Sequence, residues 1–167
     1  MGWCVLRKGG QIFSLDVLFA LGIFLVLLLL SFSLSQLAQE RAKASAQTAE
    51  MEMKAQFAMD SLLLTAGNPG DWYANASVSS LGLTTEGDYI LDLNKVQALV
   101  ALNSSWVNTS AFLGITGYQS YVHIKNGSSI LYSLGPNPSY TVHDLVIVER
   151  LAILQKKVVH VEVGVWQ

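Results

Sequence analysis

The distribution of hydrophobic and polar positions divides this chain of 167 residues into stretches with different periods. Residues 17–34 carry no charge and are almost wholly apolar. Residues 36–66 contain neither proline nor glycine and consist mostly of strong helix formers. Past Tyr118, apolar and polar residues alternate with a period of two, which indicates strands. The pattern predicts a long N-terminal helix, an irregular middle and a C-terminal sheet.

The apolar run is long enough to cross a membrane. Together with residues 12–15 it spans about 34 Å as a helix, against a hydrocarbon core of about 30 Å. Arg7 and Lys8 precede it without an acidic residue, which predicts a cytoplasmic N-terminal end and an extracytoplasmic remainder. Asp16 breaks the pattern, because a carboxylate near a membrane centre costs about 2.5–3.5 kcal/mol, although near the end of a helix it can reach the interface.

The second part of the predicted helix is amphipathic and is expected to pack on the head. Gly67 and Pro69 predict that the helix ends near Ala66. The first part is apolar on every side, so it requires lipid or sister helices. The positions predicted to share the packing face are Ala46, Ala49, Met53, Phe57 and Leu64, widened near the end by Leu62 and Leu63.

The remaining pattern predicts an α+β fold in which the long N-terminal helix packs against a C-terminal antiparallel β-sheet head. Residues 92–102 read as a short helix capped by Asp92, and residues 112–115 as a further turn. Trp72 and Trp106 are expected to be buried anchors for the loops of this region.

Two hairpins are predicted in the C-terminal third. The first turns at Asn126-Gly127, and the second joins residues 145–154 to residues 156–166. Four valines at alternate positions from 159 to 165 predict one buried face for a sheet of four strands.

The start of the chain combines a basic leader, an acid and the apolar helix, in the order Lys8-Gly9-Gly10-Gln11-Ile12-Phe13-Ser14-Leu15-Asp16. No small-residue cleavage site follows the apolar core, unlike an ordinary secretory signal. This order resembles the class III signal peptide of archaeal type IV pilin-like proteins, in which a prepilin peptidase cuts before the helix and Gln-x-Ser-x-Glu often follows. Gln11, Ser14 and Asp16 match with one extra residue and with Asp for Glu. The cut is therefore expected at Gly10-Gln11 or at Gln11-Ile12.

The resemblance extends to residues 62–72, which look like the helix exit of that family, and to residues 148–151 and 161–166, which are similar to its last two strands. It implies a type IV pilin-like fold with a leader at 1–10, a transmembrane and polymerisation helix at 11–34, its amphipathic continuation at 35–66 and a β-rich extracellular head at 67–167. The implied function is a structural subunit of a surface filament, a homo-polymer joined through the apolar helix.

The resemblance also implies partners and a location. The partners are the prepilin peptidase, a pilus assembly ATPase and a membrane platform protein; the precursor lies in the cell membrane and the product in an extracellular filament. In such filaments the acid at the position of Asp16 pairs with the N-terminal amine of a neighbouring subunit. The alternative for Asp16 is an interfacial acid without a function.

Two other readings stay open. A non-polymerising bitopic surface protein with an extracytoplasmic binding domain would retain residues 1–10 and tolerate loss of Asp16. A minor pilin would prime or tip a filament without forming its bulk. Abundance in sheared filaments distinguishes a major from a minor subunit.

Charge and candidate chemistry narrow these readings. A net charge of −2 does not favour nucleic acid as a partner. Cys4, the one cysteine, lies in the leader, so the mature chain would contain none. His123 and His160 are expected on exposed strand faces and His143 at a strand entrance, without the spacing of a metal site. We expect no catalytic residue, no metal and no cofactor.

Four N-glycosylation sequons are present, at Asn75, Asn103, Asn108 and Asn126. The seven asparagines and 24 serines and threonines of the chain would give about one by chance. All four lie on the predicted outer side, so a glycoprotein is expected. The tight turn at Asn126-Gly127 gives that asparagine a second explanation.

Overall fold

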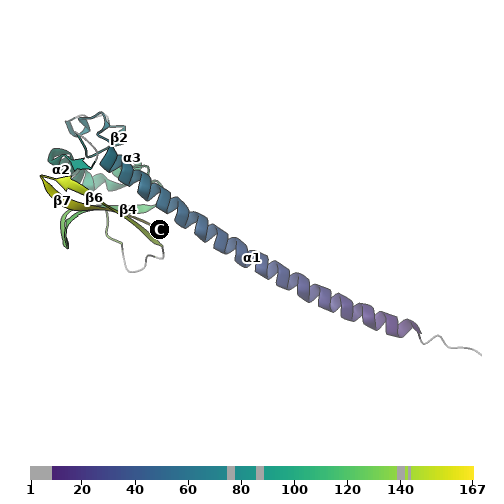
Figure 1. The fold of residues 1–167 in the computed structure, drawn as a ribbon. Helices are drawn as coiled ribbons and strands as arrows, with labels where there is room; N and C mark the ends of the chain where they lie inside the picture. The colour runs from purple at the N-terminus through teal and green to yellow at the C-terminus, as the bar shows by residue number, and fades with distance from the viewer. Residues whose placement is uncertain (1–8, 75–77, 86–88, 139–141, 143) are drawn as a thin grey trace, which may run out of the picture. The chain divides into compact units, whose positions relative to one another are not determined.

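The computed structural model describes residues 9–74, 78–85, 89–138, 142 and 144–167, with the backbone alone for residues 9–14. The chain is α+β, and its described elements form a long N-terminal helix and a head rich in antiparallel strands (Figure 1). Residues 1–46 and residues 47–167 are separate compact units. The first unit contains most of helix α1 (Gly9–Leu64), and the second contains the last part of α1 and the whole head.

Helix α1 ends at Leu64, close to the glycine and proline that predicted its end. Gly67 takes the left-handed conformation, with φ of +80°, which places glycine just beyond the helix end. The last turn is closed by side chains and by the head: Thr65 Oγ1 donates to Ser61 O at 2.7 Å, and the amides of Leu83 and Tyr89 donate to the next two carbonyls, Leu62 and Leu63, each at 2.9 Å. Three of the last four carbonyls of the helix, which would otherwise be unpaired, are thus satisfied.

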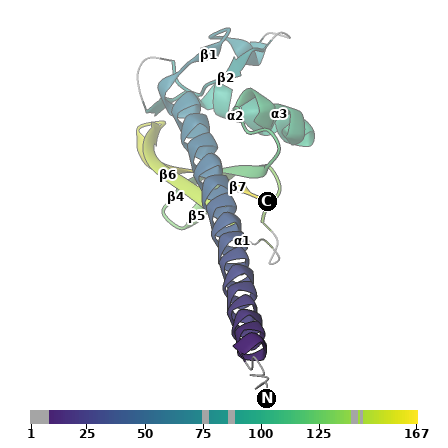
Figure 2. The same ribbon diagram turned by 90° about the vertical axis from the view of Figure 1, so that its right-hand side faces the viewer.

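The sheet of the head contains both predicted hairpins (Figure 2). In the described residues its order is β3-β6-β7-β4-β5, where β3 is Ile90–Leu91, β4 Gln119–Asn126, β5 Ser129–Leu134, β6 Leu145–Leu154 and β7 Lys157–Trp166. The four long strands are antiparallel, as predicted. Strand β3 was not predicted and pairs in parallel with the end of β6. The smaller pair of β1 (Gly67–Asn68) and β2 (Ser80–Leu81) follows the helix exit.

The core lies between the sheet and the last part of α1. The four predicted valines of β7 are almost fully buried. Of the predicted packing face, Leu62 and Leu63 are buried, but Met53 and Phe57 are 65% and 63% exposed, so most of the predicted face is wrong. The buried positions of α1 are Met51, Ala55, Ala58, Met59, Leu62 and Leu63. Methionine and alanine occur on several sides of this helix, so the apolar pattern alone did not select the face.

Short helices cover one end of the head. Helix α2 (Leu93–Ala101) begins at the predicted cap, where Asp92 accepts a hydrogen bond from the Asn94 amide at 2.7 Å. The 3-10 helix η2 (Leu102–Ser105) and helix α3 (Trp106–Phe112) follow, so residues 106–112 are helical where the sequence suggested only a turn from residue 112. A further 3-10 turn, η1 (Trp72–Ala74), follows β1.

Both predicted tryptophan anchors are buried. Trp72 is 2% exposed and donates from its indole nitrogen to Gly82 O at 2.8 Å. Trp106 is 6% exposed and donates to Ser120 O at 2.7 Å. Each ring therefore combines apolar burial with a satisfied N–H group.

Candidate assembly surface on the N-terminal helix

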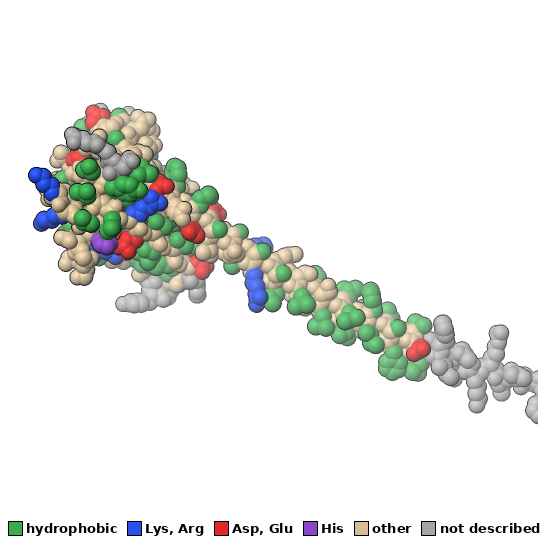
Figure 3. Space-filling model, viewed as in Figure 1, with side chains coloured by type: hydrophobic (Ala, Val, Ile, Leu, Met, Phe, Trp, Pro, Cys, Tyr) green, Lys and Arg blue, Asp and Glu red, His purple; other side chains and the backbone are tan. Residues whose placement is uncertain are grey.

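The first unit presents an apolar surface that it does not bury. The side chains concerned are 45–67% exposed and face every direction around the helix. Hydrophobic atoms cover much of this stretch in the view of Figure 3. They belong to Leu15, Val17, Leu18, Phe19, Leu21, Ile23, Phe24, Leu25, Val26, Leu27, Leu28, Leu29, Leu30, Phe32, Leu34 and Leu37. An exposed apolar surface of this extent requires lipid or another protein.

Helix α1 meets the length and composition of a membrane span. No charged residue occurs between Asp16 and Glu40, a stretch of about 34 Å at 1.5 Å per residue. Among the described residues, α1 is the one helix long and apolar enough to cross a membrane. A membrane anchor is therefore compatible with this segment.

Two serines of this stretch satisfy their hydroxyl groups within the helix. Ser33 Oγ donates to Leu29 O at 3.0 Å, and Ser35 Oγ donates to Ser31 O at 2.9 Å. Serine hydroxyls bonded to the carbonyl four residues earlier leave no unpaired donor in an apolar environment. These serines are compatible with burial against lipid or a sister helix.

Gly22 forms a notch in the apolar surface, a feature that the sequence pattern did not predict. It is the only glycine between Gln11 and Ala66, and no atom lies within 4 Å of a Cβ added there. The hollow at this position has a volume of about 340 Å³ and is lined by apolar side chains that include Phe19, Ile23 and Val26. A small residue between large ones lets a second helix approach closely. The lone glycine in an apolar run was the signal for this feature.

The predicted processing and register residues lie at the start of α1. Gly10 and Gln11 fall in its first turn, and residues 1–8 of the leader lie outside the described residues. Asp16 is exposed and lines a shallow hollow with Val17, Phe19, Ala20 and Ile23. The acid therefore borders the same apolar surface as Gly22.

The second unit holds its part of α1 by charged contacts as well as by apolar packing. Lys54 pairs with Glu50 at 3.0 Å, donates to Thr116 O at 2.8 Å and lies 4.5 Å from the centre of the Tyr118 ring. The hydrogen bond from Lys54 lowers the pKa of Glu50. Asp60 pairs with Arg150 of β6 at 3.0 Å.

A buried lysine completes the attachment of the helix exit. Lys95 of α2 is 1% exposed, and its ammonium donates to Ala66 O at 2.8 Å and to Thr84 O at 2.7 Å. Burial lowers its pKa, partly offset by Asp92 and Asp71. A cation at the C-terminal end of a helix is also favoured by the helix dipole. The sequence offered no signal for this role beyond a lysine in an amphipathic helix.

A polar cluster occupies the opposite face of the sheet. Glu162 accepts from Tyr121 at 2.7 Å and from Lys125 at 2.5 Å, and it lies 3.7 Å from His123 Nδ1. Burial raises the pKa of Glu162, but the hydrogen bonds from Lys125 and Tyr121 outweigh it and leave the pKa below its usual value. Burial, together with Glu162, raises the pKa of Tyr121 well above its usual range.

His123 is buried rather than exposed, which corrects the prediction for this residue. It is 7% exposed, with the Tyr121 ring centre 4.3 Å from its own. Burial lowers its pKa, so the ring is neutral at pH 7, and its Nε2 has no hydrogen-bond partner among the described residues. The alternation of β4 predicts that His123 lies on the face of the sheet opposite the core. It does lie there, but this part of that face is buried. His160 is half-buried and pairs with Glu149 at 2.7 Å, and His143 lies outside the described residues.

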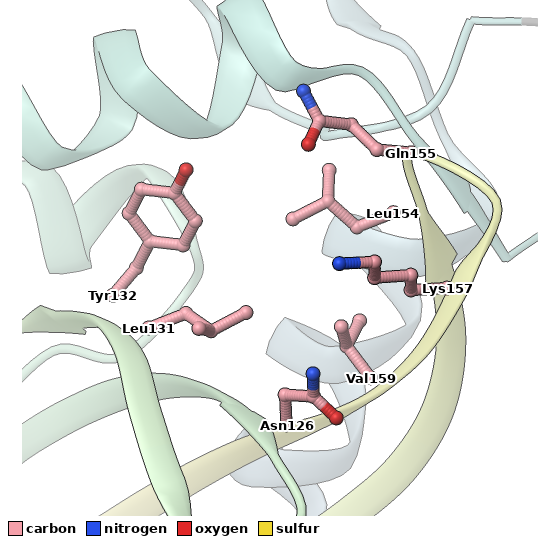
Figure 4. A pocket seen from close by; sticks show the side chains of 7 residues that line it. All are labelled: Asn126, Leu131, Tyr132, Leu154, Gln155, Lys157 and Val159. Carbon is pink, nitrogen blue, oxygen red and sulfur yellow. The ribbon is translucent and has the colours of Figure 1, made fainter.

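A small pocket lies between the two hairpin ends (Figure 4). It has a volume of about 270 Å³. Tyr132 and Leu131 line one side, Leu154 and Lys157 the other, and Asn126 lies at its lower margin in this view. These side chains bring together no paired acid and base or nucleophile, so the pocket offers no catalytic arrangement.

The predicted glycosylation sites differ in their surroundings. Asn126 is exposed at the end of β4, between the half-buried Lys125 and the exposed Gly127. Asn103 is exposed, and its Oδ1 accepts from the Gly135 amide at 2.7 Å. Asn108 is exposed on α3. Asn75 lies outside the described residues.

Within the part of the chain that the structure describes, no three histidine, cysteine, aspartate or glutamate side chains form a group suited to a metal ion. No protein family, curated protein or solved structure matches this chain. The function is therefore argued from the residues and their geometry.

Proposed function

We propose that this protein is a structural, non-catalytic subunit of a type IV pilus-like surface filament, assembled through α1 after removal of its leader. The observation that carries the proposal is the apolar surface from Leu15 to Leu37, exposed on every side of the helix. A simple membrane anchor would also be apolar, but it would not need Asp16 within the apolar surface or a notch at Gly22 beside it. Both features fit packing of helix against helix.

The proposed mechanism is an exchange of environments. Before assembly, lipid surrounds the apolar helix. A prepilin peptidase then removes the leader at Gly10-Gln11 or Gln11-Ile12, and the freed helices move from lipid into lateral contact with one another, driven by an assembly ATPase at a membrane platform protein. The Gly22 notch receives an apolar side chain of a neighbour. Asp16 pairs with the new amine of a neighbour and sets the axial register.

Single-cysteine crosslinking tests helix packing directly. In a Cys4→Ser background, the chain contains no other cysteine, so Ala20→Cys reports only contacts near the hollow that Asp16 and Ala20 line. We expect disulfide-linked dimers from Ala20→Cys in sheared filaments. Val107→Cys, at a position of the head that is 79% exposed, is the matched control and should remain monomeric. Absence of the chain from the sheared fraction, with monomeric Ala20→Cys in membranes, would favour the bitopic surface protein.

A further inference from the structure

The head contains a second hollow, between η1 and the helices α2 and α3. Its volume is about 540 Å³, within the range of small-molecule sites. Trp72, Tyr73 and Phe112 supply aromatic surface to it, and aliphatic side chains of residues 78–102 complete its floor. Tyr73 and Phe112 remain 45% and 43% exposed, so ring surface is open to an occupant.

The lining of this groove is suited to a neutral ligand with both apolar and polar groups. None of the described residues that line it is charged. Its polar members are Ser105, Thr109 and Asn108. The two hydroxyls donate to Leu102 O and Ser105 O, so the Asn108 amide is the polar group that the lining offers as a donor. Aromatic rings offer a flat apolar surface with π-faces, and amides and hydroxyls offer both donors and acceptors. A neutral sugar ring presents the complementary combination of an apolar face and hydroxyl groups.

One wall of the groove carries a sugar acceptor. Asn108 begins the sequon Asn108-Thr109-Ser110, and Phe112 lies four residues further along α3, on the same side of the helix. We propose that the groove is the seat of the first sugar linked to Asn108, which packs against Phe112 and Tyr73. This inference requires an extracytoplasmic head but no polymerisation, so it can fail independently of the proposed function.

The order of events follows from the burial of the sequon. Thr109 and Ser110 are 2% and 5% exposed, and their hydroxyls donate to Ser105 O at 3.1 Å and Val107 O at 3.0 Å. A transferase cannot reach these groups in the folded head, so the sugar is attached before α3 forms. In that step the bond from Asn108 Nδ2 to the anomeric carbon forms as the bond from that carbon to the phosphate of a lipid-linked saccharide breaks. The phosphate leaves with the electron pair, and the amide loses one proton.

The first measurement is the mass of the peptide that contains Asn108, from the full chain isolated from its native host. We expect a neutral saccharide on Asn108. An unmodified Asn108 would overturn the proposal.

The second measurement tests the seat with a double-mutant cycle on the full chain in detergent. Because the sugar no longer contacts an aromatic ring, Asn108→Gln should lower the melting temperature of the head by about 1–6 °C. Phe112→Ala should have a smaller effect in the Asn108→Gln background than in the glycosylated protein, since the two changes remove the same contact. Additive effects on a glycosylated Asn108 would contradict the seat.

Two matched controls keep the cycle interpretable. Val107→Ala changes a neighbour on α3 that does not line the groove, and it should be additive with Asn108→Gln. Asn126→Gln removes a different sequon and should be additive with Phe112→Ala. If Phe112→Ala prevents folding, Tyr73→Ala takes its place in the same cycle with the same expected coupling.

Discussion

Asp16 is the residue at which assembly and simple anchoring differ most. In the proposed filament it faces an amine in an apolar environment, where loss of one partner of an ion pair costs about 3–5 kcal/mol. We predict that Asp16→Asn lowers the yield of sheared filaments at least about tenfold. The amount of protein in membranes should not fall, because the change removes a charge from the apolar helix.

Two controls separate this effect from processing and from general charge loss. Asp16→Glu keeps the carboxylate and should restore filaments. Glu40→Gln removes the next acid beyond the apolar stretch and should have no effect. The mass of the mature chain verifies that the leader is still removed. Filaments of Asp16→Asn at the wild-type level would show that the acid has no role in assembly.

His123 should make the stability of the head depend on pH. Burial lowers its pKa, whereas the unfolded residue titrates near 6.5. Between these values the unfolded state binds more protons, so stability is lost as the pH falls from about 6.5 through the pKa of the folded state. His123→Gln should flatten this slope by up to about 1.4 kcal/mol per pH unit.

Denaturant unfolding at several pH values measures this slope. The salt concentration is kept constant, because Glu162 and Lys125 also face the ring and their effect on it depends on screening. Ser133→Ala is the control, since Ser133 is the cross-strand neighbour of His123 and does not titrate. An unchanged slope in His123→Gln would assign the acid sensitivity to other groups.

At the scale of elements, the last part of α1 can be tested with two methionines of the same helix. Met59 is fully buried and Met53 is 65% exposed. Met59→Ala should destabilise the head by about 2–4 kcal/mol, because it leaves a cavity in the core. Met53→Ala should change the free energy of unfolding by less than about 0.5 kcal/mol. Equal losses in denaturant unfolding would contradict the buried face described here.

Elements with strong local signals could be predicted from the sequence. Asn126-Gly127 located the first hairpin, the alternating valines gave the buried face of β7, and Asp92 gave the start of α2. Each signal depends on one turn, one strand or one cap, so it needs no knowledge of the rest of the fold.

Features that depend on distant contacts could not be predicted in this way. Strand β3 has two residues and pairs with β6 more than 60 residues later. His123 is buried although its strand position lies opposite the core. Lys95 is buried where it binds the helix exit. The packing face of α1 was misassigned because Met53 and Phe57 are apolar but exposed.

At the scale of the whole molecule, the two units differ in whether they bury their own apolar side chains. The head buries a core of its own between the sheet and the last part of α1. From Leu15 to Leu37, where the structure describes the side chains of the first unit, none of the large apolar ones is buried. The apolar surface and the special position of Asp16 could be predicted from the sequence. The Gly22 notch and the groove beside Asn108 could be found only in the structure. The proposed filament supplies the missing partner as further copies of the same surface.

The N-terminal residue of the native protein tests this account most directly. Intact-mass and peptide mass spectrometry would be applied to the protein from membranes and from the sheared surface fraction. The account predicts a chain in the sheared fraction that begins at Gln11 or Ile12. A chain that begins at Met1 and occurs only in membranes would contradict it and would leave an anchored surface protein.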